Sequence, residues 1–212
     1  PTREDAMREY ARIWTLLGGR QIEDLVELPL INDPEVLDTL DVFSEAVTPS
    51  FFFDEHLLSL VVCRLVSLSL EYGNCDASCF AYVLLSRVAG PRFGDFQFGF
   101  RFGQLGYDLV EQRGLKRFEA KTYLCFSIFS VRWMKPVQAC RDLLRRAFAA
   151  ANRLGDIPYA AYACNSMNSD LLFAGEPLPE AQAEAERGLA YVERMHFGLV
   201  IDFIATQLAL IR

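Results

Sequence analysis

The chain has 212 residues, of which 52% are apolar and 23% are charged, and its formal net charge is −7 at pH 7. This composition excludes a disordered chain and is typical of a protein that buries a substantial core. No apolar run reaches membrane-spanning length, since the longest candidate, Leu57 to Leu70, contains Arg64. Pro1 is followed by charged residues rather than by a secretory signal, and we expect a piece of a longer protein.

Apolar side chains recur at helical spacing from the start of the chain. Residues 2–19 form an amphipathic segment that ends in two glycines, and a short apolar and acidic helix follows to about Leu30. Asn32-Asp33-Pro34 then supplies a stop and a new start, because proline is favoured in the first turn of a helix. Beyond it the pattern predicts helices over 34–47, 54–72, 76–89, 95–113, 115–131, 135–154, 157–174, 178–195 and 198–211.

A fixed spacing relates the ends of these helices. Gly73, Gly114 and Gly155 each follow a predicted helix and are equally spaced, with a period of about 41 residues that is typical of helical hairpins. Glycine is favoured just past a helix end, where the backbone turns left-handed. We call this spacing the glycine register. Counting one period back from Gly73 gives Asn32, a good match for a left-handed cap, and counting one period forward from Gly155 gives His196, a weaker match. The sequence therefore predicts an all-α fold, a right-handed α-α superhelix or solenoid.

Prolines, glycines and aspartates mark the boundaries between the predicted helices. Thr48-Pro49-Ser50, Gly90-Pro91 and the segment from Gly175 to Pro179 are interpreted as breaks. Asp54 and Asp76 stand at the starts of helices and are expected to act as N-caps.

One segment carries two periodicities. From Phe93 to Gly103, phenylalanine alternates with other residues, as it would in a strand. The same rings also form i,i+4 pairs, such as Phe98 with Phe102, and the glycines around Gly99 and Gly106 would let a neighbouring helix approach closely. Because the glycine register assigns the second helix of a hairpin to this stretch, we predict a helix.

Acidic and basic residues are segregated along the chain. Between Gln21 and Cys63 there are ten acidic residues and no lysine or arginine, whereas residues 84–153 contain thirteen basic residues and five acidic ones. The basic part could meet nucleic acid, phosphate or an acidic domain of the same protein. Alternatively, these charges are the solvated face of a solenoid.

The residue patterns of catalysis and metal binding are missing. The glycines from Gly99 to Gly106 are not followed by the lysine and hydroxyl of a phosphate-binding loop. His56 and His196 have no nearby partners for a metal or a nucleophile. Of six cysteines only Cys75 and Cys79 lie close together, without a zinc ligand set, which favours free thiols in a reducing, cytoplasmic compartment. We therefore expect no catalytic residue, cofactor or metal.

Polar residues inside one predicted helix are the best candidates for ligand contact. Asn165 and Asn168 lie, with two serines, in the helix predicted over 157–174, although such residues are disfavoured in helix interiors. In hairpin solenoids the first helix of each hairpin lines the concave face. We expect the two asparagines to bind a ligand on that face, together with Tyr123 and Ser127. Tight helix packing by small polar residues is the alternative.

Four segments resemble the repeat region of very large bacterial signalling proteins: Gln21–Pro29, Ser69–Asn74, Phe93–Glu111 and His196–Val200. Those proteins carry a serine/threonine-kinase-like domain, a STAND-type AAA ATPase, a long TPR-like helical-repeat region, a GAF domain and often a histidine kinase. The resemblance covers most of the chain and places it after the ATPase. No catalytic residue of those domains has a counterpart in this chain.

The resemblance implies that residues 1–32 lead in from an upstream domain and that residues 33–212 are TPR-like repeats in one continuous array. We expect a non-enzymatic regulatory segment that couples the ATPase to downstream domains, its partners being domains of its own chain. One alternative is a sensor for a small-molecule or peptide inducer, and another is a nucleic-acid-binding repeat domain of a transcriptional regulator. A third is an enzyme whose site is shared with other domains. Nothing indicates a membrane partner.

Overall fold

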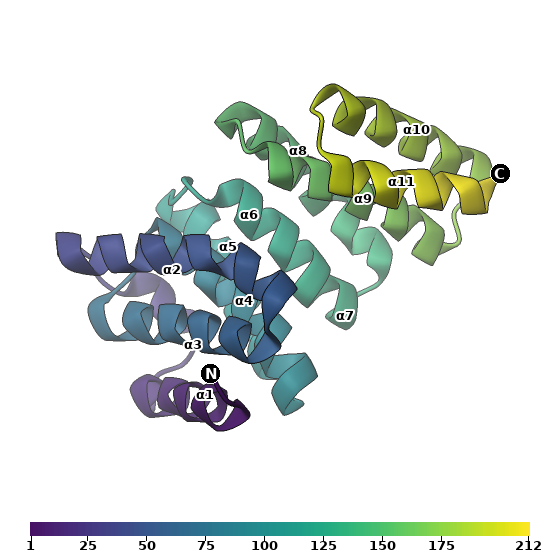
Figure 1. The fold of residues 1–212 in the computed structure, drawn as a ribbon. Helices are drawn as coiled ribbons and strands as arrows, with labels where there is room; N and C mark the ends of the chain where they lie inside the picture. Colours follow the sequence, from purple (N-terminus) through teal and green to yellow (C-terminus); the bar gives the residue numbers. More distant parts are fainter. The chain divides into compact units, whose positions relative to one another are not determined.

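The computed structural model describes residues 1–212, and the chain is helical throughout, without a strand (Figure 1). Its α-helices are α1 (Arg3–Leu17), α2 (Pro34–Phe53), α3 (Glu55–Tyr72), α4 (Asp76–Phe93), α5 (Phe96–Arg113), α6 (Glu119–Cys125), α7 (Arg132–Met134), α8 (Cys140–Leu154), α9 (Ile157–Ala174), α10 (Leu178–Arg194) and α11 (Gly198–Ile211). Three further segments are the 3-10 helices η1 (Glu23–Glu27) and η3 (Val137–Ala139) and the π-helix η2 (Phe126–Val131). The predicted all-α class is confirmed.

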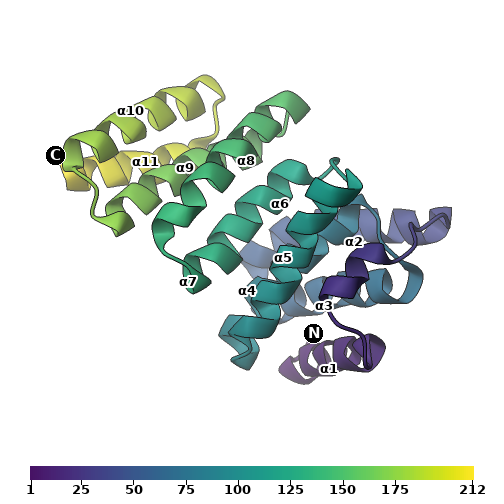
Figure 2. The same cartoon turned by 180° about the vertical axis from the view of Figure 1, so that it is seen from behind.

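The chain forms two compact units, Pro1–Glu119 and Ala120–Arg212. In the first unit α1 and α2 both pack against α3, and α4 lies beside α5 (Figures 1 and 2). In the second unit α8 packs against α9, α9 against α10, and α10 against α11. One continuous array over residues 33–212 stays a prediction.

The predicted period recurs in the helix ends. The last residues of α3, α5, α8 and α10 are Tyr72, Arg113, Leu154 and Arg194, so the first two intervals are equal and the third is shorter by a single position. α3, α5 and α10 are each the second of two consecutive α-helices, and α8 follows the continuous helical segment α6–η2–α7 and the short η3. The chain therefore repeats a two-helix unit. The regularity runs through the sequence of both compact units, although it does not by itself define a superhelix.

The capping residues explain this spacing. Gly114 and Gly155 cap α5 and α8 in the left-handed region, with φ of 68° and 73°. His196, after α10, also has a positive φ of 56°, so the forward projection of the register is good. Asn32 ends no helix and precedes the Asp33 N-cap of α2, so the backward projection, which we expected to be better, is wrong.

The glycine-rich segment forms the helix predicted from the register. α5 starts at Phe96, and Phe98 and Phe102 pack along it with ring centroids 4.9 Å apart. A Cβ on Gly106 would lie 2.4 Å from the Cys79 carbonyl oxygen of α4, so α5 can approach this closely only because the residue is glycine. Close packing thus outweighs the low helix propensity of glycine here.

Two helices end later than the prolines at which we predicted breaks. α2 continues through Pro49, and α4 continues through Pro91, each to a phenylalanine further on. A proline removes only its own N–H, so later residues can still complete the ladder. The Asp54 N–H, for example, donates to the Ser50 carbonyl oxygen at 3.1 Å. Thr48–Ser50 and Gly90-Pro91 are therefore not helix ends.

One predicted cap and one predicted helix start are also wrong. Cys75, not Asp76, is the N-cap residue of α4. The Asp76 carboxylate instead accepts a hydrogen bond from the backbone N–H of Arg117 at 2.8 Å. Arg117 lies in the segment where we predicted a helix starting at residue 115. That N–H is bound outside a helix, and α6 starts only at Glu119. The helix predicted to 131 then widens into the π-helix η2 before α7.

Candidate functional site

The acidic and basic segments of the first unit meet each other. Five arginine–carboxylate ion pairs join the two segments: Arg87–Glu55, Arg92–Glu55, Arg101–Glu23, Arg113–Glu27 and Arg117–Asp41. The acidic segment and the basic segment of the sequence are therefore paired with each other in the folded chain. These arginines already have anionic partners in their own chain, so they are not a bare cationic surface.

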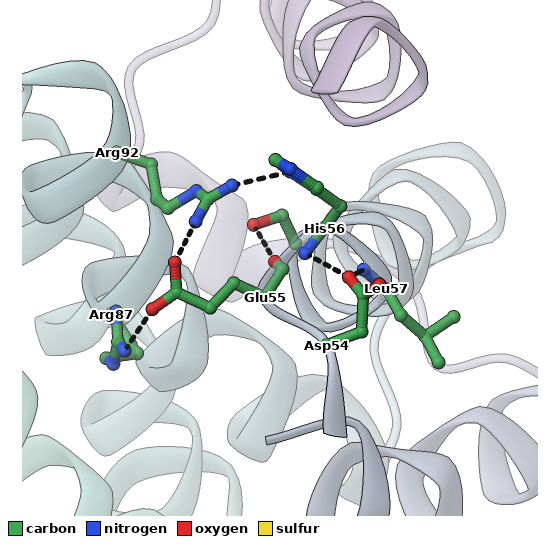
Figure 3. A network of polar contacts seen from close by, with 7 residues as sticks. Asp54, Glu55, His56, Leu57, Arg87 and Arg92 are labelled. Atoms are coloured by element: carbon green, nitrogen blue, oxygen red, sulfur yellow. Dashed lines mark hydrogen bonds and ion pairs between the residues drawn. The ribbon is translucent and has the colours of Figure 1, made fainter. Parts of the chain in front are cut away.

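The densest part of this network lies where α3 begins and α4 ends (Figure 3). The Asp54 carboxylate caps α3 as predicted, accepting from the N–H groups of His56 and Leu57 at 2.6 and 2.9 Å. Glu55 lies between Arg87 and Arg92, and Arg92 Nη2 is 2.7 Å from His56 Nδ1. Since arginine only donates, His56 Nδ1 accepts. This network ties the start of α3 to the end of α4.

The second unit contains a small, half-open pocket. Its volume is about 40 Å³, enough for about two or three water molecules. It lies against α8 and α9, with η3 and α10 completing the wall. The residues that line it are Val137, Gln138, Arg141, Leu144, Arg145, Met167, Asp170, Leu171, Ala174 and Glu184.

A buried carboxylate faces this pocket. Asp170 is only 7% exposed, and its Oδ1 lies 2.6 Å from Arg132 Nη2. The Arg132 guanidinium compensates the charge of this carboxylate, and both Asp170 oxygens are shielded from solvent. Burial raises the pKa of the Asp170 carboxyl above its ordinary value of 3.8, while Arg132 acts in the opposite direction. Asp170 is therefore a buried carboxylate in the lining of the pocket, paired with Arg132.

Charged side chains of both signs surround the pocket. Arg141 is held by Glu176 at 2.7 Å. Arg145 is bound much more loosely, because its ion pair, to the highly exposed Asp142, spans 3.6 Å and its own side chain is 66% exposed. Glu184 adds a second carboxylate and pairs with Arg187 at 2.5 Å. Arg145 is thus the lining arginine most available to an incoming anion.

The predicted contact residues Tyr123 and Ser127 are both buried. The Tyr123 hydroxyl accepts from Arg146 Nη2 at 2.8 Å. The Ser127 hydroxyl, within the π-helix, donates to the Cys140 carbonyl oxygen at 3.5 Å. Neither residue lines the pocket.

Asn165 and Asn168 face α11 instead of the pocket. Gln207 of α11 donates to Asn165 Oδ1 and to the Ser169 hydroxyl, both at 3.0 Å, and accepts from the Asn168 amide. These contacts fit the alternative that the polar residues pack helices together. Asn168 Oδ1 is buried without a hydrogen-bond partner, and ligand binding by the two asparagines stays a prediction.

The sequence interpretation missed Asp170 and Arg132. One signal was present, since Asp170 is the only charged residue in α9, Ile157–Ala174. A lone buried charge in an otherwise uncharged helix is expected to have a specific partner. The identity of that partner, which lies in an earlier segment next to a π-helix, could not be obtained from spacing.

The cysteines are free thiols and five of the six are buried. Burial raises the pKa of Cys125 to about 12, so this thiol stays protonated. The side chains form no group of three or more His, Cys, Asp or Glu that could hold a metal ion. None of the helices is both long enough and apolar enough to cross a membrane.

Comparisons with models of known protein families, with curated proteins and with solved structures found no match.

Proposed function

We propose that the chain is a regulatory and protein-interaction segment of a bacterial signal-transduction protein, built from TPR-like hairpins that stack as a right-handed superhelix. The observation that carries this proposal is the nearly even spacing of the hairpin ends at Tyr72, Arg113, Leu154 and Arg194. Such a repeat is typical of helical arrays whose role is to bind and position other domains. In this proposal the segment couples an upstream ATPase to downstream sensor and kinase domains in the cytoplasm.

Contacts among the segments that carry the family resemblance support the proposal. Asn74, from Ser69–Asn74, donates from its side chain to the Leu25 carbonyl oxygen at 2.8 Å. Arg101, from Phe93–Glu111, pairs with Glu23 at 2.7 Å. Three of the four resembling segments thus bind one another in the first unit, as expected for residues that define a structural repeat rather than an active site.

Stacked hairpins can transmit a signal by simple mechanics. Each hairpin contacts mainly its neighbours, so small rotations add along the array and move its ends relative to each other. A partner shifts the equilibrium between two shapes only by its difference in affinity for them.

Nucleic-acid binding is less well supported, because five basic side chains of the first unit already pair with carboxylates. Phosphate recognition would require those pairs to open.

The proposal is tested in the protein that contains this segment, by replacing residues 1–212 with a flexible Gly/Ser linker of similar span. We expect the ATPase rate of the replaced protein to differ at least fivefold from that of the intact protein, as for a typical coupling free energy. An unchanged rate, with the protein still folded, would show that the segment is only a spacer.

A further inference from the structure

We propose that the exposed side of α11 is a docking surface for an amphipathic helix from a neighbouring domain of the same protein, one that carries small apolar residues and a basic residue. We call this surface the α11 face. Its main residues are Leu199, Asp202, Phe203, Ala205, Ala209 and Leu210. The source of the helix rests on the proposed function, in which the partners are domains of the same protein.

The α11 face carries less charge than an ordinary solvent-facing helix surface. Of the eight exposed residues of α11, only Asp202 is charged. Leu199, Phe203 and Leu210 are 42%, 43% and 81% exposed. The neighbouring helix α10 also has eight exposed residues, and five of them are charged: Glu180, Glu186, Arg187, Glu193 and Arg194. A contiguous apolar surface such as the α11 face is typical of a site that another element covers.

α9 shows what covers an equivalent face. α9 starts at residue 157 and α11 at residue 198, one period of 41 residues later, so Ala161 corresponds to Asp202 and Cys164 to Ala205. Ala161 and Cys164 are 0% and 4% exposed and share a core with residues of α10. A Cβ on Gly188 of α10 would lie 3.4 Å from the Cβ of Cys164, so the two helices touch there. The repeat therefore predicts a helix that packs on α11 as α10 packs on α9.

α10 also indicates which residue types suit such an interface. Its buried residues form one stripe with spacings of four, three and four: Ala181, Ala185, Gly188 and Val192. Small residues at a contact allow two helices to pack with a short distance between their axes. On the α11 face Leu199, Phe203 and Leu210 supply large side chains, so a partner helix with a stripe of small residues fits them without leaving voids.

Asp202 adds a charge requirement. It is exposed among apolar residues of α11, and its carboxylate has no ion-pair partner in the chain. Covering this carboxylate without a cation would leave a buried unpaired charge, which is strongly unfavourable. A lysine or arginine on the partner helix removes that penalty, and its alkyl stem can pack on the apolar residues around Asp202.

The size of the α11 face favours a helix tethered in the same protein over a second copy of the chain. α11 has 14 residues, so the face is about 21 Å long and about 10 Å wide. Stable association of separate molecules usually buries about 800 Å² on each partner, far more than one such face offers. A tether raises the effective concentration of the partner helix, so a small surface can be occupied.

Thiol labelling measures whether the α11 face is covered. A thiol is introduced by Ala205→Cys or Ala209→Cys, and by Ala190→Cys at an exposed alanine of α10 as the matched control. Maleimide labelling of each site is followed by mass spectrometry in the 212-residue chain and in the intact protein that contains it. In the chain alone all three sites should react at similar rates. In the intact protein both α11 sites should react at least about tenfold more slowly, while the α10 site is unchanged.

Charge reversal tests for the basic residue of the partner helix. In the intact protein with Ala209→Cys, the added substitution Asp202→Lys should speed labelling about threefold or more, because two cations would then meet. Glu193→Lys, the same reversal at an exposed glutamate of α10, should leave the labelling slow.

Equal labelling of the α11 sites in the chain and in the intact protein would overturn the proposal. Labelling of the chain alone that slows as its concentration is raised would also overturn it, since a second copy would then be the occupant. Labelling that stays slow with Asp202→Lys would overturn the basic residue. An unchanged ATPase rate after linker replacement, with labelling still slowed, would contradict the coupling alone and leave the docking surface supported.

Discussion

Single residues decide how closely the helices of the first unit approach. A Cβ at Gly106 would lie 2.4 Å from the Cys79 carbonyl oxygen and 2.9 Å from a Val83 methyl, so α4 would have to shift. A Cβ at Gly19, by contrast, would meet no heavy atom within 4 Å, and the Gly19 backbone has no left-handed φ. The two glycines therefore respond differently to the same methyl group.

Gly106→Ala is expected to lower the free energy of unfolding by about 1–3 kcal/mol, since overpacking outweighs the helix propensity that alanine gains. Gly19→Ala is the control and should change it by less than about 0.5 kcal/mol. Urea unfolding followed by circular dichroism measures both. An unchanged or increased stability of Gly106→Ala would contradict the close approach of α5 to α4.

The Glu23–Arg101 pair gives a pH-dependent prediction. Its hydrogen bonds to Arg101 lower the pKa of Glu23 from 4.5 to about 2. A lowered acid pKa contributes stability above the unfolded value, and that contribution is lost as the pH falls from about 4.5 toward 2. Because the Glu23 side chain is 62% exposed, solvent screening limits the effect to about 1 kcal/mol or less.

Glu23→Gln should therefore be less stable than the parent chain at pH 7 and equally stable near pH 2, as measured by unfolding at a series of pH values. Glu193→Gln, at an exposed glutamate of α10, should show no such convergence. A stability difference for Glu23→Gln that is the same at both pH values would show that the ion pair does not form.

Residue-scale features were predicted well only where the cause is local. Asp54 was correctly expected to cap α3, because a cap depends on the next few residues. Asp76 stands in an equivalent sequence position, yet a tertiary contact with the Arg117 N–H takes its carboxylate. Asp170 and Arg132 were missed for the same reason, since their pairing depends on how α9 meets the segment after the π-helix.

At the scale of elements, helix existence was predictable and helix ends at prolines were not. The helices predicted over 157–174 and 198–211 have those bounds in the structure. The first is capped by Asp156 and Gly175, whereas the second has no side-chain N-cap and was predicted from its apolar residues. Pro49 was assigned to a break, but it is exposed and α2 continues past it. The turn after Pro49 is closed by the backbone hydrogen bond from the Asp54 N–H to the Ser50 carbonyl oxygen, which the local sequence does not report.

Pro49→Ala distinguishes the two descriptions of this segment. Within a helix, the exposed proline costs an N–H and a steric clash, so alanine should raise the free energy of unfolding by about 1–3 kcal/mol. Pro34→Ala, at the first position of the same helix, should instead lower it by up to about 1 kcal/mol. A loss of stability in Pro49→Ala, measured by denaturant unfolding, would indicate a turn at residues 48–50.

At the scale of the whole molecule, the segregated charges have a structural explanation that spacing could not provide. The acidic and basic segments pair over long stretches of the chain, as in Arg92–Glu55 and Arg113–Glu27, and such pairing depends on the tertiary fold. The glycine register, in contrast, was visible in the sequence because each repeat must end in a residue that tolerates a left-handed backbone.

The proposed coupling requires that this segment distinguish two states of its ATPase partner. The most direct measurement is a calorimetric titration of the 212-residue chain with the separately expressed ATPase domain of the same protein, once with ADP and once with a non-hydrolysable ATP analogue. We predict binding whose affinity differs at least fivefold between the two nucleotides. Absence of binding, or equal affinity in both states, would contradict the account.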